Sequence, residues 1–238
     1  SPAGLQIGDN YLLFTIPLSV ENAISARSTR GIQETNMKAH KILFVATTLA
    51  LFSAANASDL DAMMDGCNGC HGDNGVSQWG DVPTISGIDA FTHADALYVY
   101  RDAGRPCAES EYRQGDTSRP ATTMCAIAAE MSDDDIDAIA DAYAELPFVA
   151  AVQDFDAALA DAGAAIHDAE CDKCHSDGGS NVEDEASIIA GQWIPYLEQA
   201  FADYASGDRL QDKKMKEKMD PLSADDVKAL IHYYASQQ

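Results

Sequence analysis

The pentapeptide Cys-x-x-Cys-His occurs twice in the chain, as CNGCH at residues 67–71 and as CDKCH at residues 171–175. This pattern is typical of c-type haem attachment, in which two thiols add to the haem vinyl groups and the adjacent histidine binds the iron. A zinc site or a thioredoxin-like redox pair can also contain Cys-x-x-Cys. Zinc, however, takes four side-chain ligands and does not require a histidine after the second cysteine in both copies. We therefore predict two covalently bound haems, attached through Cys67, Cys70, Cys171 and Cys174 and ligated by His71 and His175.

Residues 37–57 have the pattern of a secretion signal: two lysines, a short apolar run over residues 42–52, and a small-x-small site that ends at Ala57. The apolar run is too short to span a bilayer. We expect cleavage after Ala57, export to the periplasm and no membrane span. Residues 1–36 are then expected to be an upstream, non-native extension.

The expected mature chain, residues 58–238, is strongly acidic. It contains 11 Lys and Arg against 36 Asp and Glu, a formal charge of −25. Such a surface disfavours binding to nucleic acid and to anionic membranes, because both partners are negatively charged. The charge is appropriate for a soluble exported protein.

The two halves of the chain form an internal repeat. The two motifs are 104 residues apart, as are Gly87 and Gly191, whereas Ser132 and Ser223 are only 91 residues apart. The first half therefore contains 13 extra residues between Gly87 and Ser132. We predict an all-α fold of two tandem class I-like cytochrome c domains related by this repeat, at residues 58–146 and 154–238 with a linker at 147–153.

Two cysteines remain outside the motifs, Cys107 and Cys125, and both lie in the inserted segment. An even pair of cysteines in an exported chain predicts a disulfide, which would limit the freedom of the insert in the unfolded state. The alternative is a pair of free buried thiols.

Local patterns predict the helices around each motif. Ser132 and Ser223 are each followed three residues later by aspartate, which indicates a capping box at the start of the last helix of each half. Ahead of the second motif, the spacing of Phe155, Leu159, Ala162 and Ile166 predicts one apolar helical face.

The repeat also indicates the sixth iron ligands. Met124 lies eight residues before Ser132, and Met215 lies eight residues before Ser223. Methionine is a favoured axial ligand in electron-transferring cytochromes c, so we predict Met124 and Met215 as axial haem-iron ligands. Met219 is the rival in the second half, although its counterpart in the first half is an alanine.

Several other side chains require a choice between packing and function. We expect His93 to be exposed, and we expect Met131 to pack before the last helix of its half. The carbonyl of Pro83 is a candidate partner for the His71 ring, although the second half has Ser187 in its place.

The candidates for a partner-docking surface are Trp79, Trp193 and Tyr196. Four lysines surround Met215, at positions 213, 214, 216 and 218. They form either a solvated face or a positive collar that orients an acidic partner.

The second half resembles the cytochrome subunit of flavocytochrome c sulfide dehydrogenase. The resemblance rests on the stretches FDAALADAGAAIHDAECDKCH, IIAGQWIPYL, DKKMKEKM and YYASQQ. It implies an electron-transfer subunit that is not catalytic alone. Its partner is then an FAD-bearing flavoprotein that oxidises sulfide, and its electrons pass to an acceptor cytochrome or another acceptor. The alternatives are a free-standing periplasmic dihaem cytochrome that carries electrons to a terminal oxidase, and a dihaem peroxidase. Two well-placed methionines disfavour the peroxidase, because it needs an open iron face.

Overall fold

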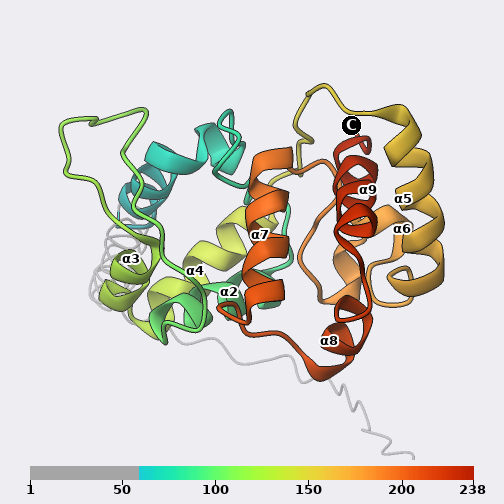
Figure 1. Cartoon of the computed structure of the whole chain (residues 1–238). Coiled ribbons are helices and arrows are strands. Elements are labelled where there is room, and N and C mark those ends of the chain that lie inside the picture. The colour runs from blue at the N-terminus through green and yellow to red at the C-terminus, as the bar shows by residue number, and fades with distance from the viewer. Residues whose placement is uncertain (1–58) are drawn as a thin grey trace, which may run out of the picture. The chain divides into compact units, whose positions relative to one another are not determined.

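The computed structural model describes residues 59–238, and the expected extension and signal segment lie outside these residues. The first half consists of a helix over residues 59–71, η1 (Asp73–Gly75), α2 (Ala90–Arg101), α3 (Met124–Glu130) and α4 (Asp133–Ala144) (Figure 1). The second half consists of α5 (Ala157–Glu170), α6 (Ser176–Gly179), η2 (Val182–Asp184), α7 (Ile194–Ser206), α8 (Lys213–Met219) and α9 (Ala224–Ala235). Within residues 59–238, the β pairing consists of one isolated bridge between Ser110 and Thr122. The prediction of an all-α fold is confirmed.

Each half has its own hydrophobic core, built partly from equivalent positions of the repeat. Tyr143 in α4 and Tyr234 in α9 lie 91 residues apart, and both are almost fully buried. Ile139 and Leu230 are a second pair at the same spacing. Ile139 is buried in the core of the first half, and Leu230 is buried in the core of the second half. The last helix of each half therefore contributes the same face to its core.

Both predicted capping boxes are present. The hydroxyl of Ser132 accepts from the backbone N–H of Asp135, while the carboxylate of Asp135 accepts from the backbone N–H of Ser132. Ser223 and Asp226 repeat this arrangement at the start of α9. These reciprocal bonds satisfy donors that the helix itself leaves unpaired, so they fix where α4 and α9 begin.

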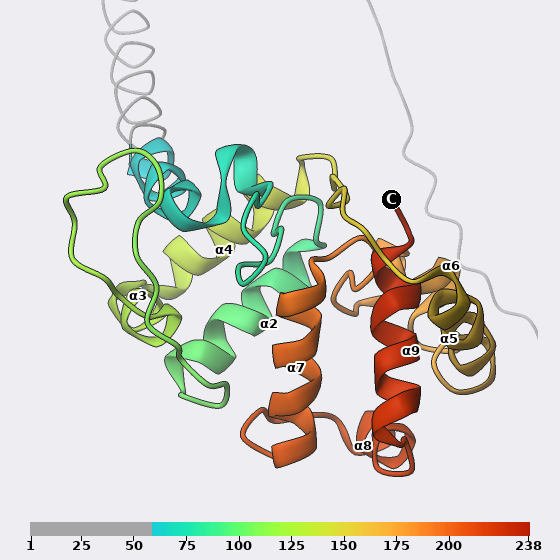
Figure 2. The same ribbon diagram turned by 45° about the horizontal axis from the view of Figure 1, so that its top comes forward.

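The buried face of α5 differs from the prediction. Phe155 precedes the helix and is exposed, because Asp156 caps the first turn. The face that is buried consists of Ala160, Gly163 and His167. A Cβ atom at Gly163 would collide with the backbone of Ala229 in α9. Close contact between α5 and α9, which lie side by side in Figures 1 and 2, selects small residues at the crossing. Of the predicted face, Ile166 is half-buried and packs against the second core.

The linker packs against the second half. The N–H of Ala151 donates to the carbonyl of Gly191 at 2.8 Å, and the side chain of Gln153 bonds to the backbone of Gln192 and Ile194. In both ribbon views α7 lies between α2 of the first half and α9 (Figures 1 and 2). None of the helices within residues 59–238 combines the length and the apolar character that a membrane span requires.

Candidate haem sites

The residues predicted to hold the first haem line one cavity. Cys67, Cys70, His71 and Met124 all contribute to its wall, and its volume is about 470 Å³. That volume is in the range of cofactor sites, roughly 300–1,000 Å³. Met131 packs against the first core, as expected, and it also lines the cavity.

His71 is held in an orientation that suits a metal ligand. The residue is 7% exposed, and Nδ1 lies 2.9 Å from the carbonyl oxygen of Pro83, as predicted. A carbonyl can only accept, so Nδ1 carries the hydrogen and Nε2 of the neutral ring keeps a free lone pair. Burial lowers the pKa of His71, although the Pro83 carbonyl opposes that shift. The ring is therefore neutral and presents one nitrogen that can bind iron.

The loop that contains Pro83 is in turn held by the second half. The amide of Gln192 accepts from the N–H of Thr84 at 3.0 Å and donates to the carbonyl of Thr84 at 2.8 Å. Gln192 is 2% exposed, so these bonds are shielded from water. This contact was not predictable from the repeat, because Ile88 stands at the position equivalent to Gln192.

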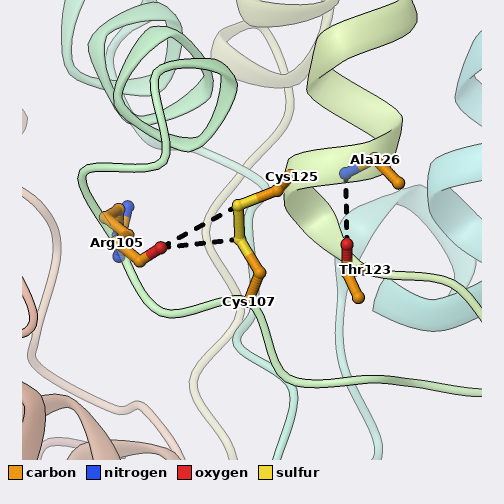
Figure 3. Close-up of a disulfide and its surroundings, with 5 residues drawn as sticks. All are labelled: Arg105, Cys107, Thr123, Cys125 and Ala126. Atoms are coloured by element: carbon orange, nitrogen blue, oxygen red, sulfur yellow. Dashed lines mark hydrogen bonds between the residues drawn. A yellow bond between two sulfur atoms is a disulfide. The ribbon is translucent and has the colours of Figure 1, made fainter.

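The pKa shifts of three motif thiols are opposite to the shift that activates a redox cysteine. Burial raises the pKa of Cys67 to about 11 and also raises the pKa of Cys70 and of Cys171. A reactive redox cysteine has a lowered pKa, because its thiolate is the nucleophile. None of the four motif cysteines is part of a disulfide, whereas Cys107 and Cys125 form the predicted disulfide with a Cα–Cα distance of 5.8 Å (Figure 3). These thiols do not support the thioredoxin-like alternative.

His93 is buried, contrary to the prediction. It is 6% exposed and lines the same cavity, with its ring centroid 5.6 Å from that of Tyr143. Burial lowers its pKa to about 4, and within residues 59–238 its Nδ1 has no hydrogen-bond partner. The repeat contained a usable signal, because His93 is equivalent to Leu197, which is 1% exposed.

The second motif is organised differently. α5 ends at Glu170, so Cys171 caps the helix and Cys174 lies exposed in the turn that follows. Nδ1 of His175 is buried and has no hydrogen-bond partner among the described residues. The expected asymmetry is therefore confirmed: the first motif has a backbone partner for its histidine, and the equivalent loop around Ser187 provides none for His175.

α8 reaches the second motif through an ion pair. Nζ of Lys218 lies 2.6 Å from Glu170, the residue before Cys171. Met215 and Met219 both belong to α8 and both are half-buried. The helix that carries both candidate ligands thus contacts the segment that carries the second motif.

The four lysines around Met215 do not form an unopposed positive collar. Lys213 pairs with Glu217, Lys216 pairs with Asp220, and Lys218 pairs with Glu170. The acidic partners offset most of the charge, so the structure favours the solvated-face interpretation over a docking collar.

The aromatic candidates for docking are all half-buried. Nε1 of Trp193 donates to the carbonyl of Ser77 at 3.0 Å, which joins the two halves, and Tyr196 lines the cavity of the first motif. Trp79 lies beneath the guanidinium of Arg113. Trp193 therefore takes part in packing between the halves, and Tyr196 in packing around the cavity of the first motif.

Comparison with known proteins places this arrangement in a class. The family described as cytochrome c oxidase, cbb3-type, subunit III matches residues 158–233. The thiosulfate dehydrogenase electron acceptor of Stutzerimonas stutzeri (strain A1501) is 30% identical over 183 residues, which is 71% of this chain and 78% of that protein.

Solved structures share the fold. Reduced cytochrome c4 from Pseudomonas stutzeri superposes with a TM-score of 0.60 at 22% identity, over 75% of this chain and 97% of that chain. Cytochrome c4 from Acidithiobacillus ferrooxidans gives 0.58 at 21% identity, over 73% and 99%. Thiosulfate dehydrogenase (TsdBA) from Marichromatium purpuratum gives 0.56 at 23% identity, over 71% of this chain and 36% of that chain.

The fold and its repeated motif define a dihaem electron carrier built from two class I cytochrome c domains, with two haem c groups. Within that class, the chain belongs to the family of the S. stutzeri thiosulfate dehydrogenase electron acceptor, and its fold is that of cytochrome c4. The resemblance to a flavocytochrome c subunit holds at the level of a dihaem cytochrome c. Its finer implication, a sulfide-oxidising flavoprotein partner, has no counterpart among these relatives, two of which are named for thiosulfate dehydrogenase.

Proposed function

We propose that this protein accepts electrons from a thiosulfate dehydrogenase and passes them to a further acceptor in the periplasm. The observation that carries the proposal is the similarity to a thiosulfate dehydrogenase electron acceptor across 78% of that protein's length. A thiosulfate dehydrogenase chain also contains a region with the same two-domain fold, since 36% of that chain is covered.

In this proposal the domains at residues 58–146 and 154–238 each hold one haem c, which supplies a one-electron Fe(III)/Fe(II) couple when bound. The ligand sets are Cys67, Cys70, His71 and Met124 in the first domain and Cys171, Cys174, His175 and Met215 in the second. The structure supports the first set most directly, because all four side chains line one cavity. A methionine and a histidine on each iron leave no open position for substrate, so the residues serve electron transfer and not bond chemistry.

The charge of the chain favours a basic electron donor. The full sequence has a formal charge of −24, and the acidic side chains are distributed over the exposed helix faces. Opposite charges raise the rate of encounter between partners, and dissolved salt screens that attraction over about 8–10 Å. Electron uptake from the proposed donor should therefore slow as ionic strength rises.

The disulfide between Cys107 and Cys125 supports an exported location, because such bonds persist in oxidising compartments. The flavoprotein of a sulfide dehydrogenase remains the second candidate donor. The sequence stretches around the second motif and α8 favour it, because they resemble the cytochrome subunit of that complex.

The test is reduction of the purified dihaem protein, followed by the absorbance of its reduced haems. The first reaction contains thiosulfate and a thiosulfate dehydrogenase. The second contains sulfide and the flavoprotein subunit of a sulfide dehydrogenase. The third contains thiosulfate or sulfide alone, with no added enzyme. We expect fast, salt-sensitive reduction in the first reaction only. Fast reduction confined to the second reaction overturns the proposal in favour of the flavoprotein. Enzyme-like reduction in the third identifies the chain as a catalyst itself.

A further inference from the structure

Two arginines at equivalent positions of the repeat line the cavity of the first motif. Arg105 and Arg209 are 104 residues apart, and both contribute to the cavity wall together with Cys70 and His71. Arg209 is only 9% exposed. The cavity of the first motif is therefore lined by one arginine from each half.

A pair of tyrosines, also 104 residues apart, accompanies the arginines. The guanidinium of Arg105 lies 4.5 Å from the centre of the Tyr100 ring, and that of Arg209 lies 4.3 Å from the centre of the Tyr204 ring. The two loops meet directly, since the N–H of Leu210 donates to the carbonyl of Gly104 at 3.0 Å. The repeat therefore places two matching cation–ring pairs together where the halves join.

The loop of Arg105 is anchored by the disulfide. The carbonyl oxygen of Arg105 lies 3.5 Å from the sulfur of Cys107 and 3.9 Å from that of Cys125 (Figure 3). On the other side, the N–H of Arg209 donates to the carbonyl of Asp203 at 3.0 Å at the end of α7. Both arginines are therefore presented by fixed backbone.

Neither guanidinium has a carboxylate partner among residues 59–238, although the chain is rich in acidic residues. Of the three carboxylates that line the cavity, Asp81 pairs with Arg113, Asp203 accepts from Gln199 at 2.6 Å, and Glu109 is exposed. A buried cation without a counter-charge is costly, and an aromatic ring attracts it without neutralising it.

The positive charge acts on the neighbouring Tyr196. Burial raises the pKa of Tyr196, but Arg209 and Arg105 more than offset that effect and the pKa is lowered overall. The potential inside this end of the cavity is therefore positive and suited to an anion. Haem c has two propionate carboxylates, and guanidinium binds carboxylate through two parallel hydrogen bonds.

We propose that Arg105 and Arg209 form a two-arginine carboxylate site that binds a propionate of the haem attached at the first motif. The second half then helps to hold the haem of the first half, through Arg209. The two positive charges also favour the reduced iron, which has one positive charge fewer than the oxidised iron.

The test is the midpoint potential of each haem in the purified dihaem protein, measured by spectroelectrochemistry in Arg105→Gln and Arg209→Gln. Arg101→Gln is the matched control, because it removes the same charge from an arginine that pairs with Asp133 and does not line the cavity. In Arg105→Gln and in Arg209→Gln we expect a lower midpoint potential for one haem. At a fixed applied potential, the oxidised-to-reduced ratio of that haem should rise by about fivefold or more. In the control Arg101→Gln the ratio should change by less than about twofold.

Two further measurements separate a propionate site from a general charge effect. Resonance Raman bending modes of the propionates should shift in both cavity variants and stay unchanged in Arg101→Gln. Arg209→Lys keeps the charge and loses the two-pronged geometry, so it should recover much of the potential without recovering the vibrational frequency. If Arg209→Gln does not mature with both haems, Arg105→Gln and Arg209→Lys provide the same readouts.

Equal shifts of potential in the cavity variants and the control overturn the proposal, as do unchanged propionate modes. These measurements use no electron donor. Their failure is therefore distinguishable from failure of the proposed role with thiosulfate dehydrogenase.

Discussion

The two halves of the molecule share their last helix and differ in the loops that surround the motif histidine. α4 and α9 begin at matching capping boxes and bury equivalent tyrosines. His71, however, bonds to the carbonyl of Pro83, whereas Nδ1 of His175 has no partner among the described residues. The repeat therefore preserves the helical frame more faithfully than the environment of each iron ligand.

The difference has a physical origin in the contacts between the halves. Gln192 of the second half fixes the backbone of Thr84 beside Pro83 in the first, and the repeat offers no equivalent residue to do the same in return. The disulfide and the inserted segment also belong to the first half alone. Two domains with the same helical plan thus give two unlike sites, and unlike surroundings give haems different potentials.

The largest expected effect tests whether the repeat extends to the sixth ligand. Met215→Ala should remove about half of the weak far-red absorbance that a methionine–iron bond gives in ferric cytochromes c, since one of two such bonds is lost. Met219→Ala is the matched control, because it lies one helical turn further along α8 and should leave the band intact. The reverse result means that the repeat register is wrong in this segment.

The next effect tests the close crossing of α5 and α9 in the second half. Gly163→Val should destabilise the protein to denaturant by about 3 kcal/mol or more, because the added side chain forces apart two helices that touch through their backbones. Ala165→Val on the exposed face of α5 is the control, with an expected cost below about 1 kcal/mol from helix propensity alone. Similar midpoints for the two variants would contradict the crossing geometry.

The disulfide should contribute to the first half alone. Replacing both Cys107 and Cys125 with serine should lower the free energy of unfolding by about 2–4 kcal/mol, because the bond closes a loop across a sequence separation of 18 residues. Mass spectrometry should still show both haems attached. Two alkylatable thiols in the unreduced wild-type protein would contradict the bond.

The capping boxes should be worth the same in both halves. Ser132→Ala and Ser223→Ala are each expected to cost about 1 kcal/mol, because each leaves backbone donors of the first turn unsatisfied. Denaturant unfolding of the two single variants measures this directly. A large difference between them would break the equivalence of α4 and α9.

Acid should remove part of this stabilisation. The hydrogen bonds from Ser132 and Ser223 lower the pKa of Asp135 and Asp226 from 3.8 in the folded state. A lowered folded pKa means that the contribution is fully present above 3.8 and is lost as the pH falls through the lower folded value. The cost of each serine variant should therefore shrink when unfolding is measured at about pH 2.

The smallest expected effect concerns the bond between the halves. Gln192→Ala should loosen the Pro83 carbonyl, weaken electron donation from His71 and raise the potential of the first haem, with a shift of about twofold in the oxidised-to-reduced ratio. Gln238→Ala is the control, because the amide of Gln238 donates to the carbonyls of Gln153 and Ala235 and contacts neither Gln192 nor the Pro83 loop through a hydrogen bond. An unchanged potential in Gln192→Ala, or an equal shift in both variants, would contradict this positioning role.

The sequence alone determined the features that depend on short spacing. The paired motifs, both capping boxes, the all-α class and the Cys107–Cys125 bond were predictable, because each rests on residues a few positions apart or on a simple count of cysteines. The Pro83 carbonyl was predictable for the same reason, since it lies only 12 residues after His71.

The tertiary structure decided which helix faces are buried and which charged side chains lie close together. Burial of His93, the small-residue face of α5 and the bond from Gln192 to Thr84 all depend on segments brought together from distant parts of the chain. The ion pairs of the α8 lysines and the meeting of Arg105 with Arg209 are of the same kind. Periodicity shows that a helix has an apolar face, but the distance of closest approach to its neighbour determines which residues fit there. The position of a buried charge is likewise set by the partner that another segment supplies.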